Sequence, residues 1–366
     1  MRKCIVIISL LVGGTLFAAN PFEGDLKSKN VVKVCDAVVD WQIKHHHESK
    51  HHILDWTNGA LYRGMTEWGK IAGNQKCYEF VEKIGVENRW NMWDRVYHAD
   101  DICVGQAFIE MYRKSGDLRM LQPTKERAFY VASHPSTAPV VKTDPIGKDE
   151  RWSWCDALFM APPVYAALYQ LTGERIYLDY MNSEYKACVE ALYDKEEKLF
   201  YRDNKRIPLR EKNGAKQFWG RGNGWVFGGL PLIIDNLPVE CSSRAYYINL
   251  FAELAESIRK TQCEDGSWRT SLLDPDSYDM PENSCSAFMC YGIAWGIRNG
   301  YLAKRTYTAV LEKGWKSLVK AVHADGKLGY IQPVGAAPKA AGYDATDVYG
   351  VGAFLLAGSE ILKLNK

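Results

Sequence analysis

The chain has 366 residues, of which 47% are hydrophobic and 25% are charged. This length and composition predict a globular protein that can bury a large core without a metal or a disulfide framework. The 46 basic and 44 acidic residues nearly cancel, which argues against a nucleic-acid-binding protein because such proteins usually carry a strongly basic surface. The 12 Trp and 21 Tyr suit sugar binding, but a large helical core also uses them.

The N-terminus predicts a secretory signal peptide over residues 1–19. Arg2 and Lys3 precede an apolar run at 5–11, and small residues then lead to a polar asparagine. This order is typical of a signal peptide, and the segment is short for a membrane span. We therefore expect an exported protein, periplasmic or extracellular, without membrane attachment after cleavage. No linker divides residues 20–366, which predicts a single domain.

Cysteine and histidine do not form a recognisable ligand pattern. The ten cysteines are scattered without a CxxC pair, so most are expected to be buried small residues, with one or two disulfides left open. Histidines cluster at 45–47 and 51–52 without the HExxH spacing of a zinc site. A solvated loop is expected there, and neither a metal nor another cofactor is predicted.

Six segments each start with a polar residue and continue as a helix rich in Gly, Ala and aromatic residues. They begin at Asn58, Asp101, Asp156, Asn223, Ser286 and Asp347. Asp, Asn and Ser are good N-caps because their side-chain oxygens accept unpaired backbone N–H groups. Amphipathic helices alternate with these segments, for example at 175–192, 244–262 and 305–322.

About twelve helices of two alternating kinds predict an all-α fold, an (α/α)6 barrel of six helical hairpins. Gly and Ala would let the inner helices crowd around a central axis. An open solenoid of helix pairs is the alternative, but uneven repeat lengths and long loops favour the closed form. In a barrel the loops before the inner helices gather on one face. These loops are rich in Trp and Asp, which predicts a pocket walled by aromatic rings.

The first candidate for chemistry is Asp156, which follows Trp152-Ser-Trp154-Cys and precedes an apolar helix. A helix N-cap alone would explain an Asp at this position. A carboxyl at a helix start beside indole rings could also serve as a positioned proton donor. Apolar surroundings favour its protonated form, whereas the helix dipole opposes it. The sequence leaves the balance between these two effects open.

Two further motifs carry polar residues of interest. In Trp219-Gly-Arg221-Gly-Asn223-Gly-Trp225, three glycines allow close backbone approach, and an Arg fork between Trp rings could hold a sugar carboxylate. A tight loop with Arg221 in a structural salt bridge is the alternative.

The other motif is the pair of adjacent carboxylates at Asp100 and Asp101, which could supply a second acid or base or orient a water molecule. Alternatively, one caps a helix and the other is solvated. We favour Asp101 over Asp100 as the second acidic residue.

These motifs together resemble the unsaturated rhamnogalacturonyl hydrolases of glycoside hydrolase family 105, which are related to the unsaturated glucuronyl hydrolases of family 88. The resemblance runs from about Asp55 to Leu362 and includes the final helix start at Asp347. It implies an (α/α)6 barrel that hydrates the C4–C5 double bond of the uronic acid that pectin lyases leave at a non-reducing end. The resulting hemiketal opens and releases the aglycone, whose identity stays open.

The resemblance also implies roles for single residues. One Asp protonates the double bond and then activates water, and by motif this residue is Asp156. Asp101 matches the second acidic position, and Arg221 would face the uronate carboxylate. The substrate-binding positions are Trp154, Trp219, Arg221, Asn223, Trp225 and Asp100. Some family members place a His near 199–203, where this chain has none, so Arg202 or Asp203 is the candidate to take its place.

Two other kinds of function are compatible with these residues. An inverting glycosidase or a sugar epimerase could use the same barrel, and an inverting enzyme would need two carboxyls about 6.5–9.5 Å apart and would cleave saturated chains. A non-catalytic sugar-binding protein would give no reason for a protonatable Asp among Trp residues. In each case the expected ligand is an oligosaccharide, and the sequence assigns no protein partner.

Overall fold

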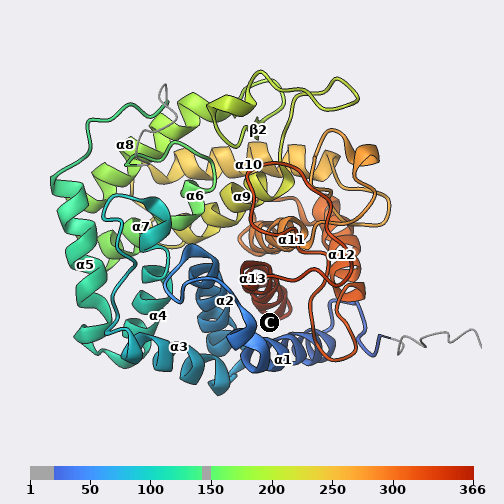
Figure 1. The fold of residues 1–366 in the computed structure, drawn as a ribbon, viewed down its shortest axis with the longest axis horizontal. Coiled ribbons are helices and arrows are strands. Elements are labelled where there is room, and N and C mark those ends of the chain that lie inside the picture. The colour runs from blue at the N-terminus through green and yellow to red at the C-terminus, as the bar shows by residue number, and fades with distance from the viewer. Residues whose placement is uncertain (1–19, 142–149) are drawn as a thin grey trace, which may run out of the picture.

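The computed structural model describes residues 20–141 and 150–366, so the predicted signal peptide at 1–19 lies outside the described residues. In these ranges thirteen α-helices form two concentric rings (Figure 1). The outer ring consists of α1 (Ser28–His45), α3 (Gln75–Glu87), α5 (Leu118–Ser133), α8 (Arg175–Leu192), α10 (Arg244–Lys260) and α12 (Lys304–Lys320). The inner ring consists of α2 (Trp56–Ala72), α4 (Gly105–Ser115), α6 (Ala157–Met160) followed by α7 (Pro162–Thr172), α9 (Gly220–Ile234), α11 (Asn283–Arg298) and α13 (Val348–Leu364).

Short elements connect the helices. Strands β1 (Tyr193–Asp194) and β2 (Leu199–Phe200) form an antiparallel hairpin. Four 3-10 turns lie in loops: η1 (His46–Glu48), η2 (Ala99–Ile102), η3 (Asn204–Arg206) and η4 (Pro275–Ser277). The predicted (α/α)6 barrel is confirmed. In the described ranges, no helix is both long and apolar enough to cross a membrane.

The two rings differ in burial as their sequences predict. All residues of α9 and the segment Val348–Leu362 of α13 are buried, because each inner helix contacts neighbours on every side. An outer helix such as α12 buries one stripe, including Leu311, Trp315 and Leu318 at three- and four-residue spacing. The apolar core therefore fills the space within and between the rings.

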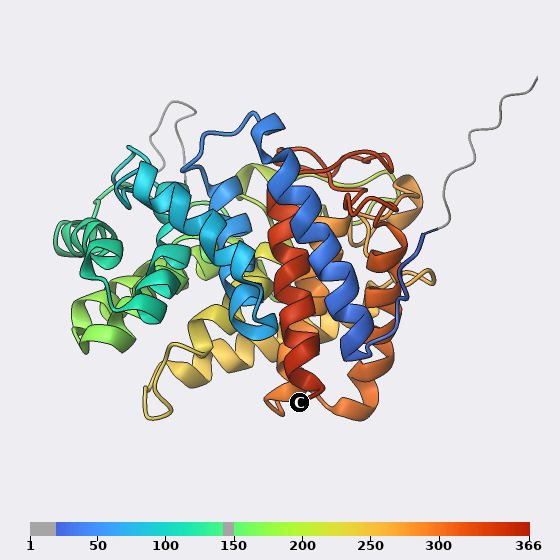
Figure 2. The same cartoon turned by 90° about the horizontal axis from the view of Figure 1, so that it is seen from below.

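The barrel is closed by contact between its first and last inner helices. Figures 1 and 2 show α13 between α1 and α2. A Cβ added to Gly352 would lie 2.2 Å from the carbonyl oxygen of Ala60, and one on Gly64 would lie 2.3 Å from the carbonyl oxygen of Gly352. Only glycine permits this approach of two helix backbones. The open solenoid is therefore not the fold of this chain.

The helix starts differ in detail from the sequence-based prediction. Asp347 does cap its helix, since its Oδ1 accepts a hydrogen bond from Val348 N at 2.8 Å. The predicted starts Asn58 and Asn223 instead lie inside α2 and α9, where they make no cap. Asp55 and Glu282, whose capping roles were not predicted, accept backbone hydrogen bonds at the starts of α2 and α11. Several inner helices thus begin a few residues earlier than expected.

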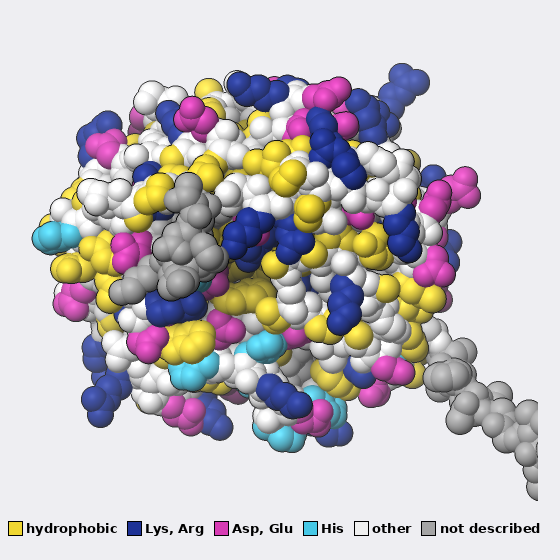
Figure 3. Space-filling view, turned by 45° about the horizontal axis from the view of Figure 1, so that its top comes forward, with side chains coloured by type: hydrophobic (Ala, Val, Ile, Leu, Met, Phe, Trp, Pro, Cys, Tyr) yellow, Lys and Arg dark blue, Asp and Glu magenta, His cyan; other side chains and the backbone are white. Residues whose placement is uncertain are grey.

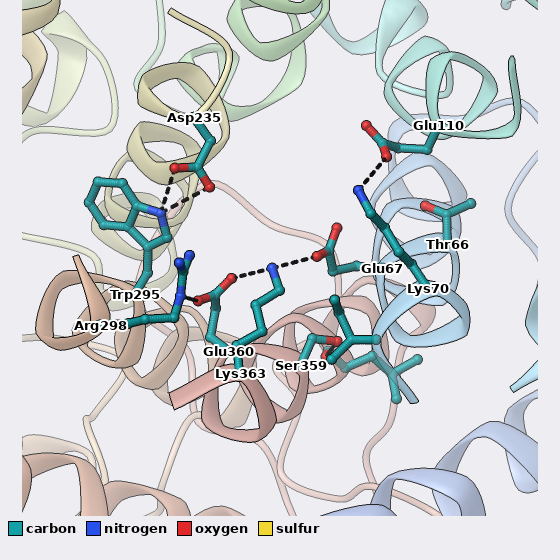
Figure 4. A network of polar contacts seen from close by, with 12 residues as sticks. Thr66, Glu67, Lys70, Glu110, Asp235, Trp295, Arg298, Ser359, Glu360 and Lys363 are labelled. Carbon is teal, nitrogen blue, oxygen red and sulfur yellow. Dashed lines mark hydrogen bonds and ion pairs between the residues drawn. The ribbon is translucent and has the colours of Figure 1, made fainter. Parts of the chain in front are cut away.

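Ion pairs tie the inner helices together at the end opposite to their starts (Figure 4). Lys363 Nζ on α13 lies 2.6 Å from Glu67 Oε1 on α2 and 2.6 Å from Glu360 Oε1. Arg298 Nε on α11 lies 2.8 Å from Glu360 Oε2. Trp295 Nε1 donates to both carboxylate oxygens of Asp235, at 3.0 Å each. The charged groups at this end therefore have partners, and they brace the barrel.

The nine described cysteines are all free thiols, and seven of them are buried. This agrees with the expectation that most serve as small core residues. Cys4 lies in the segment that the structure does not describe.

Candidate active site

The loops that lead into the inner helices meet on one face, which is the upper edge in Figure 2. Figure 3 shows a hollow in this face, walled by hydrophobic side chains, with Lys and Arg side chains along one border and His and acidic side chains near the opposite one. The predicted site motifs all enter or precede inner helices around this hollow. Aromatic walls with a few charged groups are typical of a sugar-binding pocket.

Asp156 lies at the N-cap position of α6, yet its side chain makes no capping hydrogen bond. The residue is only 8% exposed. Its Oδ2 lies 3.4 Å from Arg202 Nε and 3.7 Å from Cys155 Sγ. Burial raises the pKa of Asp156, and the positive charges of Arg202 and then Arg221 oppose this rise. The helix-cap explanation of this Asp is therefore wrong, and its carboxyl is available for proton transfer.

Asp100 belongs to η2 and faces the same site. Burial raises the pKa of Asp100 well above its usual range, and repulsion from Asp156 adds to this rise. His98 Nδ1 lies 3.6 Å from Asp100 Oδ2. Two carboxyls that interact in this way bind and release protons as a pair. Asp100 and Asp156 together can therefore retain a proton at a pH where an exposed carboxyl has lost its own.

Asp101, the next residue, is fully buried. Its Oδ1 lies 2.5 Å from Arg95 Nη2, and its Oδ2 accepts a hydrogen bond from Arg95 N at 2.8 Å. With both oxygens committed to Arg95, the carboxylate fixes the loop before η2. The structure thus corrects our preference for Asp101 over Asp100, because the 3-10 turn directs adjacent side chains to different surroundings.

Arg221 is also placed differently from our expectation. Its guanidinium is fully buried between the rings of Trp219 and Tyr349, with centroids at 4.5 and 4.9 Å. Nη1 donates to Tyr349 Oη at 3.0 Å, and Nη2 donates to the carbonyl oxygen of Pro333 at 3.1 Å. Arg221 thus holds a distant loop by hydrogen bonds and is not arranged as a fork open to a substrate carboxylate. Arg221 therefore has the structural role that was the alternative prediction, although within the described residues it acts through hydrogen bonds and makes no salt bridge.

Asn223, predicted to bind substrate, is a buried scaffold residue. Its Oδ1 accepts a hydrogen bond from Phe200 N at 2.8 Å, and its Nδ2 donates to the carbonyl oxygens of Phe200 and Trp219 at 3.0 and 3.1 Å. These bonds attach β2 to α9. The expectation of substrate contact is therefore corrected: Asn223 positions the strand that leads to Arg202.

The three predicted Trp residues are all buried. Trp225 is fully buried, and its ring packs 4.8 Å from Phe159 and 4.5 Å from Phe288. Trp219 is almost fully buried, and its Nε1 donates to Gln332 Oε1 at 2.9 Å. Both support the pocket from beneath. Trp154 is buried but lies beside His98, with ring centroids 4.9 Å apart, at the level of the two carboxyls.

The loop aromatics expected around the pocket include Trp56, whereas the sequence assigned no role to Tyr349 or His98. Half-buried Trp56 stands edge-on to Trp225, with ring centroids 5.7 Å apart, and 5.3 Å from Tyr349. Tyr349 itself lies two positions after the predicted start at Asp347, which is a signal that could have drawn attention to it. His98 precedes the Asp pair in the same motif.

The histidine cluster lies at the rim and is partly ordered by side-chain contacts. His51 Nε2 lies 2.9 Å from Asp347 Oδ1, which raises the pKa of His51. His46 Nε2 and Asn58 Oδ1 are 2.8 Å apart, and His52 stacks on Trp93 with centroids 4.8 Å apart. The expectation of a solvated loop therefore holds only in part, because His47 and His52 are exposed whereas His46 and His51 are partly buried and bonded to other side chains. Among the described residues, no group of three or more His, Cys, Asp or Glu is arranged to hold a metal ion.

A closed ring of six helical hairpins with carboxyls and aromatic rings on the face where its inner helices begin defines a six-hairpin glycosidase. Comparison with known families agrees with this class. Residues 32–365 match the family described as Glycosyl Hydrolase Family 88. The chain belongs to this family, and it is a glycosidase.

Individual relatives cover nearly the whole chain. An unsaturated 3S-rhamnoglycuronyl hydrolase of Formosa agariphila is 37% identical, over 99% of this chain and 98% of the relative. A second protein of that description, from an Alteromonas species, is 34% identical over 91% of this chain and 86% of its own length. The solved structure described as Polysaccharide Lyase BACCELL_00875 is 32% identical and superposes with a TM-score of 0.83, covering 92% of this chain and 97% of that one.

Proposed function

We propose that this glycosidase removes a 4,5-unsaturated uronic acid from the non-reducing end of lyase-generated oligosaccharides by hydrating its double bond. One observation carries the proposal. The carboxyl of Asp156 stands at a helix start without capping the helix, and burial raises its pKa so that it favours the protonated form. A carboxylic acid in this state can deliver a proton to the electron-rich carbon of a vinyl ether.

The reaction then follows from one acid that becomes a base. The Asp156 proton adds to C4, and the positive charge that develops is shared between C5 and the ring oxygen. The Asp156 carboxylate then accepts a proton from a water molecule whose oxygen bonds to C5, which regenerates the acid. The hemiketal at C5 opens by breaking the bond to the ring oxygen, which leaves a hemiacetal at C1. Collapse of this hemiacetal to the aldehyde releases the aglycone.

Asp100 is the second acidic residue in this proposal, in place of Asp101. Its electrostatic coupling to Asp156 and its raised pKa support a role as a protonated group beside the reacting carbon. In that state it can donate a hydrogen bond to a sugar oxygen while Asp156 exchanges its own proton. Protonation of both carboxyls also removes the electrostatic repulsion between Asp100 and Asp156.

We propose a 3-sulfated rhamnose as the aglycone. The two relatives above carry this specificity in their descriptions, and together they cover almost the entire chain at 37% and 34% identity. An aglycone from pectin, which the sequence motifs suggested, stays an alternative prediction. An assay that compares unsaturated uronyl disaccharides with sulfated rhamnose, unsulfated rhamnose and galacturonic acid as the second sugar separates these substrates.

A lyase is the second candidate, because a structure described as a polysaccharide lyase shares this fold at 32% identity. The two activities change ultraviolet absorbance in opposite directions. Hydration consumes the conjugated double bond of an unsaturated substrate, so absorbance falls, whereas a lyase creates that bond in a saturated chain, so absorbance rises. We expect a fall with unsaturated disaccharides and no change with saturated chains. A rise with saturated chains would replace the hydrolase proposal, and cleavage of saturated chains without absorbance change would indicate an inverting glycosidase.

We also propose that the protein is exported. The support is the order of basic, apolar and small residues over 1–19. N-terminal sequencing of protein recovered from the periplasm or medium of the expressing cells should begin at Asn20. Protein retained in the cytoplasm with Met1 in place would contradict export.

A further inference from the structure

Under the proposed function, the substrate brings a negative charge close to Asp156, which itself becomes negative when it gives its proton to C4. C4 receives the proton, and its neighbour C5 carries the uronate carboxylate. A side chain that reaches C4 therefore lies within a few ångströms of that carboxylate. Like charges this close in a water-poor pocket repel each other strongly. The site needs a cation that can contact the substrate carboxylate beside Asp156.

Arg221 does not meet this need. Its terminal nitrogens are committed to Tyr349 Oη and to loop carbonyl oxygens, and its side chain has no exposed surface. Only its Nε lacks a partner, and this atom is buried. A guanidinium binds a carboxylate best through two parallel N–H groups, and Arg221 cannot offer two without breaking these contacts.

Arg202, by contrast, is partly exposed and lies beside Asp156. It follows β2, and its carbonyl oxygen accepts a hydrogen bond from Cys155 N at 2.9 Å, which holds the backbone of Arg202 against the segment that carries Asp156. Its side chain is 28% exposed, and its Nε lies 3.4 Å from Asp156 Oδ2. Nη1 donates to Asp203 Oδ2 at 2.8 Å. Neither Nε, which is buried beside Asp156, nor Nη2 makes a hydrogen bond within the described part of the chain.

We propose that Arg202 is the receptor for the uronate carboxylate and that it exchanges its ion pair with Asp156 for one with the substrate. In the free enzyme, the Arg202 guanidinium lies beside the Asp156 carboxyl, with Nε 3.4 Å from Oδ2. In the complex, Nε and Nη2 turn from Asp156 to the substrate carboxylate, while Nη1 keeps its hydrogen bond to Asp203. This inference rests on the proposed function, because it is the unsaturated uronate that supplies the carboxylate.

The exchange couples substrate binding to the protonation of Asp156. Arg202 is the largest influence that opposes the raised pKa of Asp156. Once the substrate carboxylate shares this cation, that opposition weakens and a further negative charge lies nearby, so the pKa of Asp156 rises. Binding thus favours the protonated acid that the first step requires. The other charged or titratable groups that influence or are influenced by Asp156 are Asp100, Cys155, Cys188 and Arg221.

The test compares Arg202→Gln, Arg202→Lys and the control Arg210→Gln on two substrates. Arg210 lies on the same loop and is exposed, and among the residues that the structure describes its side chain donates only to the carbonyl oxygens of Ile207 and Leu209. The substrates are one unsaturated uronyl disaccharide and its methyl ester, which lacks the negative charge. A lost charge-assisted contact should lower kcat/KM for the uronate about 10- to 100-fold in Arg202→Gln, mainly through KM, with a much smaller effect on the ester.

The pH profile supplies a readout that general damage to the fold would not move. The rate requires protonated Asp156, so kcat/KM falls on the alkaline side as the free enzyme loses this proton. Removing the Arg202 charge raises the pKa of Asp156, so Arg202→Gln should shift this alkaline limb to higher pH. Arg202→Lys keeps the charge, so its limb should stay near that of the wild type while its KM for the uronate rises.

Equal losses on uronate and ester, or an alkaline limb that does not move in Arg202→Gln, would overturn the role of Arg202. If Arg202→Gln fails to fold, as judged by circular dichroism, the uronate-to-ester ratio of Arg202→Lys decides the question. Failure of the wild-type enzyme to consume either substrate would instead refute the proposed function. The two failures are therefore distinguishable.

Discussion

Isosteric substitution of two adjacent residues, Asp100→Asn and Asp101→Asn, should have opposite effects on stability and activity. Asp101 is fully buried against Arg95, with contacts of 2.5 and 2.8 Å. Removing the negative charge leaves the backbone N–H and the guanidinium of Arg95 with a poorer acceptor. Part of this loss is offset because the Arg95 side chain is 48% exposed and can be solvated. We expect Asp101→Asn to lower the free energy of unfolding by about 2–3 kcal/mol. For a chain of this size this is a fall of about 3–4 °C in Tm.

Asp100 should behave in the opposite way because burial penalises its charge. The folded-state pKa of Asp100 is raised, so its contribution to stability is fully present below the unfolded pKa of about 4 and is lost as pH rises through the folded value. Asp100→Asn cannot ionise and escapes this loss. The variant should gain stability over the wild type as pH rises above about 4, by up to about 1.4 kcal/mol for each pH unit until the folded pKa is reached.

Thermal unfolding of the three proteins between pH 4 and 8, with initial rates on an unsaturated disaccharide, tests both expectations. Asp101→Asn should lose stability but keep most activity in its folded fraction. Asp100→Asn should gain stability at neutral pH and lose activity by at least about 100-fold, as expected for a group that assists proton transfer. A stable, inactive Asp101→Asn beside an active Asp100→Asn would refute the assignment of the two carboxylates.

Two further substitutions test the scaffold. Gly352→Ala should lower the free energy of unfolding by about 1–3 kcal/mol, because a Cβ would lie 2.2 Å from the carbonyl oxygen of Ala60. The control Gly342→Ala, whose added Cβ would have no atom within 4 Å, should leave Tm unchanged. Equal Tm values for the two variants would contradict closure of the barrel through the Gly352 contact. Asn223→Ala should lower the free energy of unfolding by about 2–5 kcal/mol in urea denaturation, because the buried N–H and carbonyl of Phe200 lose their partner. If Asn223→Ala instead keeps its stability and has a raised KM, Asn223 binds substrate, as the sequence predicted.

Local patterns were sufficient to predict the fold. Small-residue helices alternating with amphipathic ones predicted the two rings, since Gly and Ala are needed where helices crowd an axis. Closure itself depends on contacts such as Gly64 with Gly352, which lie far apart in sequence. The alternation could suggest such contacts but could not pair them. Helix starts were less predictable because the glycine-rich entry of α9 begins at Gly220, before the polar Asn223.

The site was predictable where its chemistry is local and not where it depends on distant partners. The Trp-rich start of α6 drew attention to Asp156. The direction of Asp100 and Asp101 depends on the geometry of η2 and on Arg95, which no spacing rule connects to them. Arg221 has its partners at Gln332 and Pro333, in a loop far along the chain. An Arg beside Trp in a sequence therefore does not reveal whether its fork faces substrate or backbone.

Isotope labelling during turnover tests the central claim most directly. In heavy water, protonation of C4 by Asp156 must place deuterium on C4 of the released sugar, because the acidic proton exchanges with solvent before it is transferred. We predict one deuterium at C4, seen by nuclear magnetic resonance as the sugar forms, and no product from Asp156→Asn. Release of the aglycone without deuterium at C4, or product formation by Asp156→Asn at a rate near that of the wild type, would contradict the account.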